Sequence, residues 1–209
     1  MNIAIFVNHP KCSIQSVNGI IRSLPDHKFK IFTKHSVEDN FFSDVDLVCF
    51  PGGLGDSDSF DTILKHNKHH IKEFVARGKP YLGICMGAYW ADKIYFDILD
   101  RTRVVQYIKQ PNTCTRRPHA KLIDVIWSGE KQQMFFYDGC TYLEGDFSIV
   151  AFYLKTLYPM AIIQDNIGLI GCHPEADQHW FNSYSYTRDF WHGGKQYQLL
   201  NEFVERLTK

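Results

Sequence analysis

One cysteine stands in a spacing that is typical of a catalytic nucleophile. Cys85 occupies the middle of Gly83-Ile84-Cys85-Met86-Gly87, between an apolar run that predicts a strand and a segment that predicts a helix. This is the pattern of a nucleophile elbow, in which a sharp turn exposes the reactive atom. The N–H groups that begin the following helix would favour the thiolate, the reactive form of cysteine. A buried structural cysteine in a glycine-rich turn is the alternative interpretation.

A thiol nucleophile needs a base, and the base needs a group that orients it. The late segment Gly171-Cys172-His173-Pro174-Glu175 offers an imidazole and a carboxylate after another apolar run. Pro174 fixes its own φ and stiffens the spacing between them. A carboxylate beside an imidazole can stabilise the imidazolium form. The pattern predicts a triad of Cys85, His173 and Glu175, and a turn histidine capped by Glu175 is the alternative.

A glycine-rich turn, Pro51-Gly52-Gly53-Leu54-Gly55, ends a further apolar run. Parallel strands end at the same edge of a sheet, so this turn is expected beside Cys85. A backbone N–H freed by glycine there, together with the N–H of Met86, would form an oxyanion hole. A phosphate-binding loop is disfavoured because Asp56-Ser57 stands where that loop requires Lys followed by Ser or Thr. A simple turn is the remaining alternative.

The elements that must position these residues alternate in the first part of the chain. Helical periodicity predicts helices over 14–24 and 63–75. The order strand, helix, strand, strand, helix, strand favours a mostly parallel sheet with helices on both faces, an α/β fold. The strands predicted there are Ile3–Asn8, Phe29–Thr33, Asp46–Phe50 and Tyr81–Ile84.

From about Val104 the pattern changes, because apolar runs follow one another with little helical signal between them. This favours an antiparallel β extension of the sheet, closed by a helix over Tyr197–Leu207. No repeat, linker or low-complexity tract interrupts the 209 residues, so a single domain over 1–209 is expected. The later predicted strands are Val104–Ile108, Lys121–Trp127, Gln132–Tyr137, Phe147–Leu154, Ala161–Gln164 and Leu169–Cys172.

Composition narrows the classes of function. Lys+Arg and Asp+Glu are both 23, so the formal net charge is zero and a nucleic-acid partner is disfavoured, although Arg116-Arg117 forms a local basic pair. The six cysteines show no CxxC spacing, which disfavours a zinc ribbon or a thioredoxin motif. His66, His69 and His70 are expected on a solvated helix face rather than at a metal. No signal peptide or bilayer-spanning run is recognisable, so a soluble, reduced, cytoplasmic protein without a membrane partner is expected.

The order of the three motifs resembles the class I glutamine amidotransferase superfamily. Within it, three stretches look most like the amino-terminal domain of eukaryotic biotin–protein ligases and its stand-alone microbial relatives, and the resemblance runs from about residue 3 to 175. It implies a flavodoxin-like α/β core, the Cys85–His173–Glu175 triad, and Gly53 and Met86 as oxyanion donors. The three stretches are Tyr81–Ala91, Tyr137-Asp138-Gly139 and Ile167–Glu175.

Departures from the superfamily pattern bear on activity. Glutamine-hydrolysing members carry Gln four residues after the nucleophile, where this chain has Tyr89, and no synthetase domain is seen to receive ammonia. Weak or absent glutaminase activity is therefore expected. The chain also lacks the Gly-Arg-Gly-Arg loop of biotinyl-adenylate formation, so a biotin ligase reaction by this chain alone is not expected. Related proteases and chaperones often place His directly after the cysteine, where Met86 stands here.

The expected function is that of a cysteine-dependent hydrolase or transferase acting on a small amide or ester, without a metal or an organic cofactor. Cys85 would attack the carbonyl and His173 would move the proton, while Gly52, Tyr89 and Tyr137 would line the pocket of a small-molecule substrate. The alternative is a non-catalytic module of the same fold that binds a metabolite or a partner in biotin metabolism. Nothing in the sequence names the substrate or specifies an oligomeric state.

Overall fold

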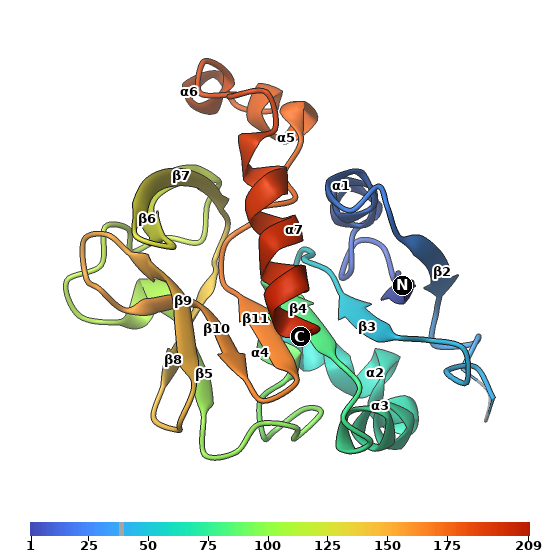
Figure 1. Ribbon diagram of the computed structural model, residues 1–209. Helices are drawn as coiled ribbons and strands as arrows, with labels where there is room; N and C mark the ends of the chain where they lie inside the picture. The colour runs from blue at the N-terminus through green and yellow to red at the C-terminus, as the bar shows by residue number, and fades with distance from the viewer. Residues whose placement is uncertain (38–39) are drawn as a thin grey trace.

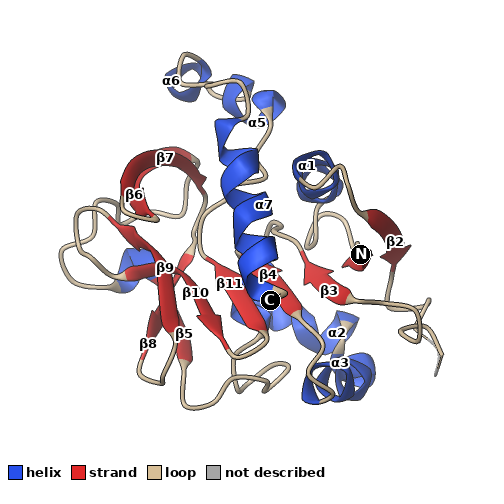
Figure 2. Ribbon diagram, viewed as in Figure 1, coloured by secondary structure: helices blue, strands red, loops and turns tan. Residues whose placement is uncertain are grey.

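The computed structural model describes residues 1–37 and 40–209. In these residues a mixed sheet of nine strands has the order β2-β1-β3-β4-β11-β10-β9-β6-β7 (Figures 1 and 2). Neighbouring strands pair in parallel from β2 to β11. The parallel strands are β1 (Asn2–Phe6), β2 (Lys28–Phe32), β3 (Leu47–Phe50), β4 (Tyr81–Ile84) and β11 (Ile167–Ile170).

From β11 to β7 every neighbouring pair is antiparallel. The mostly parallel α/β sheet and its antiparallel extension, both predicted from the sequence, are confirmed. These outer strands are β10 (Pro159–Gln164), β9 (Ser148–Tyr153), β6 (Lys121–Trp127) and β7 (Glu130–Phe136).

The strand predicted over Val104–Ile108 requires correction. β5 (Arg103–Gln106) is followed by a 3₁₀ turn, Tyr107–Lys109, and it does not join the main sheet. It pairs instead with β8 (Cys140–Leu143), which the sequence analysis missed. β8 lies between turn residues with positive φ, Asp138 and Glu144, and is too short to show a clear period.

Helices cover both faces of the parallel part of the sheet. α1 (Ile14–Ser23) and α7 (Lys195–Leu207) pack side by side on one face, where Val17, Ile20 and Phe203 enter the core (Figure 1). The other face is covered by α2 (Phe60–Ile63), α3 (Lys68–Ala76) and α4 (Met86–Trp90). The helix predicted over 63–75 is thus divided, because a 3₁₀ turn over Lys65–Asn67 separates α2 from α3.

A short helical segment follows the His-Pro-Glu motif. α5 (Gln178–Asn182) begins at Asp177, whose side chain accepts hydrogen bonds from the backbone N–H groups of His179 and Trp180. α6 (Ser185–Arg188) comes next, and Figure 1 shows both helices beyond one end of α7. Among the described residues, no helix combines the length and the apolar character needed to cross a lipid bilayer.

Candidate active site

Cys85 lies on a strained turn between β4 and α4. Its backbone has φ 48° and ψ −101°, outside the region that a non-glycine residue ordinarily adopts. The flanking glycines are required for close packing: a Cβ on Gly83 would lie 2.6 Å from the carbonyl oxygen of Gly87, and a Cβ on Gly87 would collide with the carbonyl of Phe50. The turn therefore has the geometry of a nucleophile elbow.

The structure places His173 and Glu175 in direct contact and removes both from solvent. His173 Nδ1 lies 2.9 Å from Glu175 Oε1, and the two side chains are 2% and 0% exposed. The backbone N–H of His173 donates to the carbonyl of Phe135 in β7 at 2.9 Å, which fixes the loop against the sheet. A buried carboxylate at this position orients the imidazole ring and favours its protonated form.

The fold brings Cys85 and His173 to the same point, against Gly52. A Cβ on Gly52 would lie 2.5 Å from His173 Cε1 and 3.5 Å from the Cys85 Cβ. The thiol itself points to the carbonyl oxygen of Tyr137, with Sγ 3.6 Å away. Burial disfavours a charged His173, but the Glu175 carboxylate and the Cys85 sulfur outweigh it and raise the pKa of His173 to about 10.

The environment of Cys85 differs from that of the other buried thiols. Burial raises the pKa of Cys12, Cys49, Cys140 and Cys172 above the ordinary value, so these side chains remain neutral thiols at neutral pH. Cys85 instead borders an open cavity and has an imidazole beside it.

Ser16 is a site residue that sequence reasoning missed. Its hydroxyl donates to Glu175 Oε1 at 2.6 Å and accepts from the Gly52 N–H at 3.1 Å. The Ser13 N–H donates to the Gly52 carbonyl at 2.9 Å, so the start of α1 binds both the N–H and the carbonyl of Gly52. Nothing in the sequence beyond its place in the first turn of α1 marks Ser16, because its partners are far along the chain.

Gly53 and Met86 each present a backbone N–H near the cysteine. The Gly53 N–H donates no hydrogen bond to any described residue, while the next N–H, of Leu54, donates to the Pro10 carbonyl at 2.9 Å. A Cβ on Gly53 would collide with the carbonyl of Lys11, so only glycine fits there. Met86 is the first residue of α4, where an N–H has no acceptor within the helix.

A cavity of about 810 Å³ opens in front of Cys85, and Gly53, Met86, Tyr89 and Tyr137 line it. The Tyr89 hydroxyl donates to the Asp138 carbonyl at 3.0 Å. Burial raises the pKa of Tyr89 well above its ordinary value, so it stays neutral. Charged side chains border the rest of this cavity: Asp56, Asp58, Asp92, Lys93, Arg103, Lys109 and Asp138.

Gly52 lies elsewhere than the sequence analysis expected. It is buried behind the cysteine and the imidazole, and it borders neither the cavity at Cys85 nor a second cavity on the far side of His173. Its role is to let His173 approach the backbone. In residues 1–37 and 40–209, no three His, Cys, Asp or Glu side chains gather as metal ligands would.

The fold is similar to that of solved glutamine amidotransferases. A glutamine amidotransferase from Thermotoga maritima superposes with a TM-score of 0.71 at 15% identity, over 100% of this chain and 98% of that one. PurLQS from the same organism gives 0.67 at 16%, over 99% and 98%. A glutamine amidotransferase from Methylobacillus flagellatus gives 0.59 at 13%, over 100% and 92%. At these identities the likeness shows the fold alone.

The chain belongs to the family described as biotin-protein ligase, N terminal, whose model matches residues 1–107. This confirms the family resemblance recognised in the sequence. No curated protein sequence matches the chain significantly. The matched region contains Cys85 and the Gly52-Gly53 turn, whereas His173 and Glu175 lie outside it.

Proposed function

We propose that this amidotransferase-like protein is a cysteine-dependent hydrolase or transferase that cleaves a small amide or ester. The observation that carries the proposal is the buried contact of His173 with Glu175, together with the place of Cys85 beside the same imidazole at Gly52. An imidazole paired with a carboxylate is suited to take a proton from a thiol and to hold the resulting charge. The strained backbone at Cys85 is a second mark of a functional residue.

The reaction follows from these positions. Because the pKa of His173 is raised to about 10, the imidazole already holds a proton when Cys85 Sγ bonds to the substrate carbonyl carbon, and the N–H groups of Gly53 and Met86 stabilise the oxyanion. The bond to the leaving nitrogen or oxygen then breaks, and His173 returns the proton to that atom. Water, or an amine or alcohol acceptor, attacks the thioester in the same way. The acyl product leaves and the thiol is restored.

The cavity in front of Cys85 favours a polar acyl group. Asp138 has one buried carboxylate oxygen, Oδ1, without a hydrogen-bond partner among the described residues, while Oδ2 accepts from the Gln106 amide at 2.9 Å. Burial raises the pKa of Asp138 from its ordinary value, against the lowering effect of Gln106. Asp138 is one of seven charged side chains that border this cavity, and a polar acyl group suits such a lining.

Glutamine is a poor candidate for the substrate. Tyr89 occupies the position of the superfamily's glutamine-binding Gln, and its hydroxyl is already committed to the Asp138 carbonyl. We therefore expect glutamate release from glutamine to be weak or absent in a coupled assay. Robust release that disappears in Cys85→Ala would show that Tyr89 is compatible with glutamine. We propose no ligase reaction, because the sequence lacks the loop that biotinyl-adenylate formation requires.

The triad is tested by the pH dependence of Cys85 alkylation in four proteins: wild type, His173→Ala, Glu175→Gln and the double variant. Loss of the base should remove most of the reactivity, whereas loss of the carboxylate charge should remove less. Groups that act as one unit give non-additive effects, so the double variant should match His173→Ala. Identical profiles in folded wild type and His173→Ala would reject the triad and favour a non-catalytic binding module.

A further inference from the structure

A second cavity, of about 400 Å³, shares two of its lining residues with the first. His173 lines this second cavity and Cys85 does not, whereas Cys85 lines the first and His173 does not. Gly53 and Tyr137 border both. The Cys85 thiol and the His173 imidazole therefore border different chambers.

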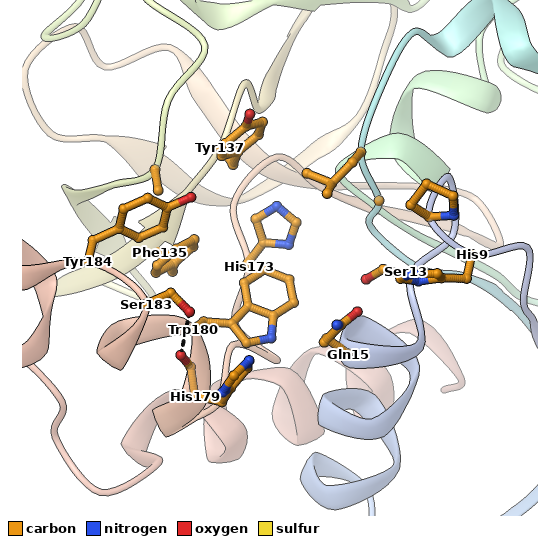
Figure 3. Close-up of a pocket in the computed structure, with 14 residues that line it drawn as sticks. His9, Ser13, Gln15, Phe135, Tyr137, His173, His179, Trp180, Ser183 and Tyr184 are labelled. Carbon is orange, nitrogen blue, oxygen red and sulfur yellow. Dashed lines mark hydrogen bonds between the residues drawn. The ribbon is translucent and has the colours of Figure 1, made fainter.

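The two chambers differ in chemistry. Among the described residues, no Asp, Glu, Lys or Arg side chain lines the second one, whereas the first is bordered by seven such side chains. Its walls near His173 are aromatic, and Figure 3 shows Phe135, Trp180 and Tyr184 around the imidazole. Ring centroids are 5.0 Å apart for His173 and Trp180, and 5.3 Å apart for Phe135 and Trp180. Such walls suit a flat apolar group.

The proposed mechanism predicts which part of the substrate occupies each chamber. The leaving atom of an amide or ester must receive its proton from His173, so it has to lie within reach of the imidazole. The acyl part remains bonded to Cys85 and belongs in the chamber that Cys85 lines. The leaving group then extends into the aromatic chamber on the His173 side.

We propose that the substrate is an ester or N-substituted amide whose leaving alcohol or amine is planar and aromatic. This inference rests on the proposed thiol mechanism. The carbonyl carbon bonds to Cys85 Sγ, the bond to the aromatic oxygen or nitrogen breaks, and that atom leaves with the proton carried by His173. Water then cleaves the thioester to a carboxylic acid. The aromatic alcohol or amine is the first product.

The test compares 2-naphthyl acetate with hexafluoroisopropyl acetate. Both carry the same acyl group and release alcohols of similar acidity, but only one of these alcohols is planar and aromatic. Acetylation of Cys85 is followed by intact mass, and each rate is divided by the rate with free N-acetylcysteine. After this correction the wild type should favour the naphthyl ester by about tenfold, the effect of ~1.4 kcal/mol of binding in the transition state.

Variants of exposed residues in and after α5 test whether the preference for the naphthyl ester depends on the aromatic chamber. Ser183→Trp places an indole in the aromatic chamber and should bring the corrected ratio close to one. Tyr184→Ala removes part of the wall and should lower the ratio about threefold. Phe190→Ala is the matched control, because Phe190 is an exposed aromatic of the same segment that does not line the chamber, and it should keep the wild-type ratio.

Two further measurements separate the inference from the proposed function. Saturable binding of 2-naphthol to Cys85→Ala, abolished by Ser183→Trp, is expected and requires no turnover. A wild-type ratio near one, or a ratio that neither chamber variant changes, overturns the leaving-group assignment. The thiol mechanism is judged separately, and a loss of acetylation in His173→Ala upholds it. If His173→Ala acetylates like wild type, the mechanism fails and the leaving-group assignment fails with it, even where 2-naphthol binds.

Discussion

A single carboxylate oxygen joins the base to the first helix. Glu175 Oε1 accepts from the Ser16 hydroxyl at 2.6 Å and contacts His173 Nδ1 at 2.9 Å, while Oε2 has no partner among the described residues. Hydrogen bonds to a buried carboxylate favour its charged form, and a fixed carboxylate fixes the imidazole. Ser16 is therefore a positioning residue for His173, acting through Glu175.

Replacing Ser16 with Ala should slow Cys85 alkylation at neutral pH by about three- to tenfold, the effect of one charge-assisted hydrogen bond. It should also shift the pH profile, because the carboxylate loses a donor. Ser23→Ala is the matched control. The Ser23 hydroxyl is also buried on this helix, but it donates to the Gly19 carbonyl at 2.8 Å instead of to Glu175. Equal profiles in the two variants would leave Ser16 with a purely structural role.

Cys85 should be the most reactive of the six thiols. Limited iodoacetamide labelling near neutral pH, followed by peptide mass mapping, should modify it well before Cys49 or Cys172, whose pKa values burial raises. The physical reason is the imidazole beside it and the cavity that gives the reagent access. Cys85→Ala should lack the fast-labelled peptide. Faster labelling of either buried thiol would contradict the assignment.

The sequence predicted those candidate site residues that carry a local pattern. Cys85, His173 and the glycine turn each stand in a motif whose steric or chemical requirement is visible within five residues. Ser16 could not be found in this way, because its partners Gly52 and Glu175 are distant along the chain and only the packing of α1 brings them together. Which face of the glycine turn meets the substrate also depends on tertiary packing.

At the scale of elements, α1 is docked on the loop that carries the base. Gly19 faces that loop, and a Cβ there would collide with the Glu175 carbonyl oxygen and lie 3.3 Å from the Glu175 Cβ. Together with the hydrogen bond from Ser16 to Glu175, this contact fixes the distance between α1 and the loop, while Ser13 binds Gly52. The position of α1 thus controls both Gly52 and Glu175.

Gly19→Ala should reverse the usual effect of removing a helical glycine. Alanine normally stabilises a helix interior by about 1 kcal/mol relative to glycine, but overpacking costs about 1–3 kcal/mol. We expect the free energy of unfolding, from urea titration, to fall by about 1 kcal/mol and Cys85 alkylation to slow. Asn18→Ala, an exposed change on the same helix, should leave both unchanged or raise stability slightly. A stabilised Gly19→Ala with normal labelling would disprove this docking.

Elements with a clear apolar pattern were predictable, whereas the short segments β8, α5 and α6 were not. α1, α7 and the buried parallel strands show clear apolar spacing over their length. β8, α5 and α6 have four or five residues each, less than the window in which a period can be recognised. Part of the aromatic chamber comes from α5 and the residues after it, so periodicity could not reveal that part; the residues are His179, Trp180, Ser183 and Tyr184.

For the whole molecule, we propose that residues 1–209 form a single domain. The nine-stranded sheet connects the motif-bearing parallel half with the antiparallel half through β11 and β10. The apolar cluster on the α1 and α7 face also contains Val125 and Trp127 of β6 and Tyr153 of β9. The whole chain should therefore unfold as one unit, and its free energy of unfolding should depend on the protonation of His173.

Unfolding stability should fall at alkaline pH through His173. Its pKa of about 10 in the folded protein lies above the unfolded value of ~6.5, so the folded state binds the extra proton between these values. The contribution is fully present below about pH 6.5 and is lost as the pH rises through 10. Urea titrations should show wild type losing about 1–3 kcal/mol more than His173→Gln between about pH 6.5 and 10.

The buried cysteines contribute a loss of the same sign, because their pKa values are raised in the folded state. They are present in both proteins, so the difference between the two titrations isolates His173. Parallel stability curves for wild type and His173→Gln would mean that the imidazole is neutral in the folded protein.

The central place of β11 affects when the thiol becomes active during synthesis. Among the described strands it is the last in the sequence, yet it lies between β4 and β10 in the middle of the sheet. A ribosome completes the Cys85 turn long before it adds β11 and the imidazole that follows. Until that late insertion, the nascent chain carries a cysteine without its base. We therefore expect Cys85 to gain its proposed base only when β11 enters the sheet.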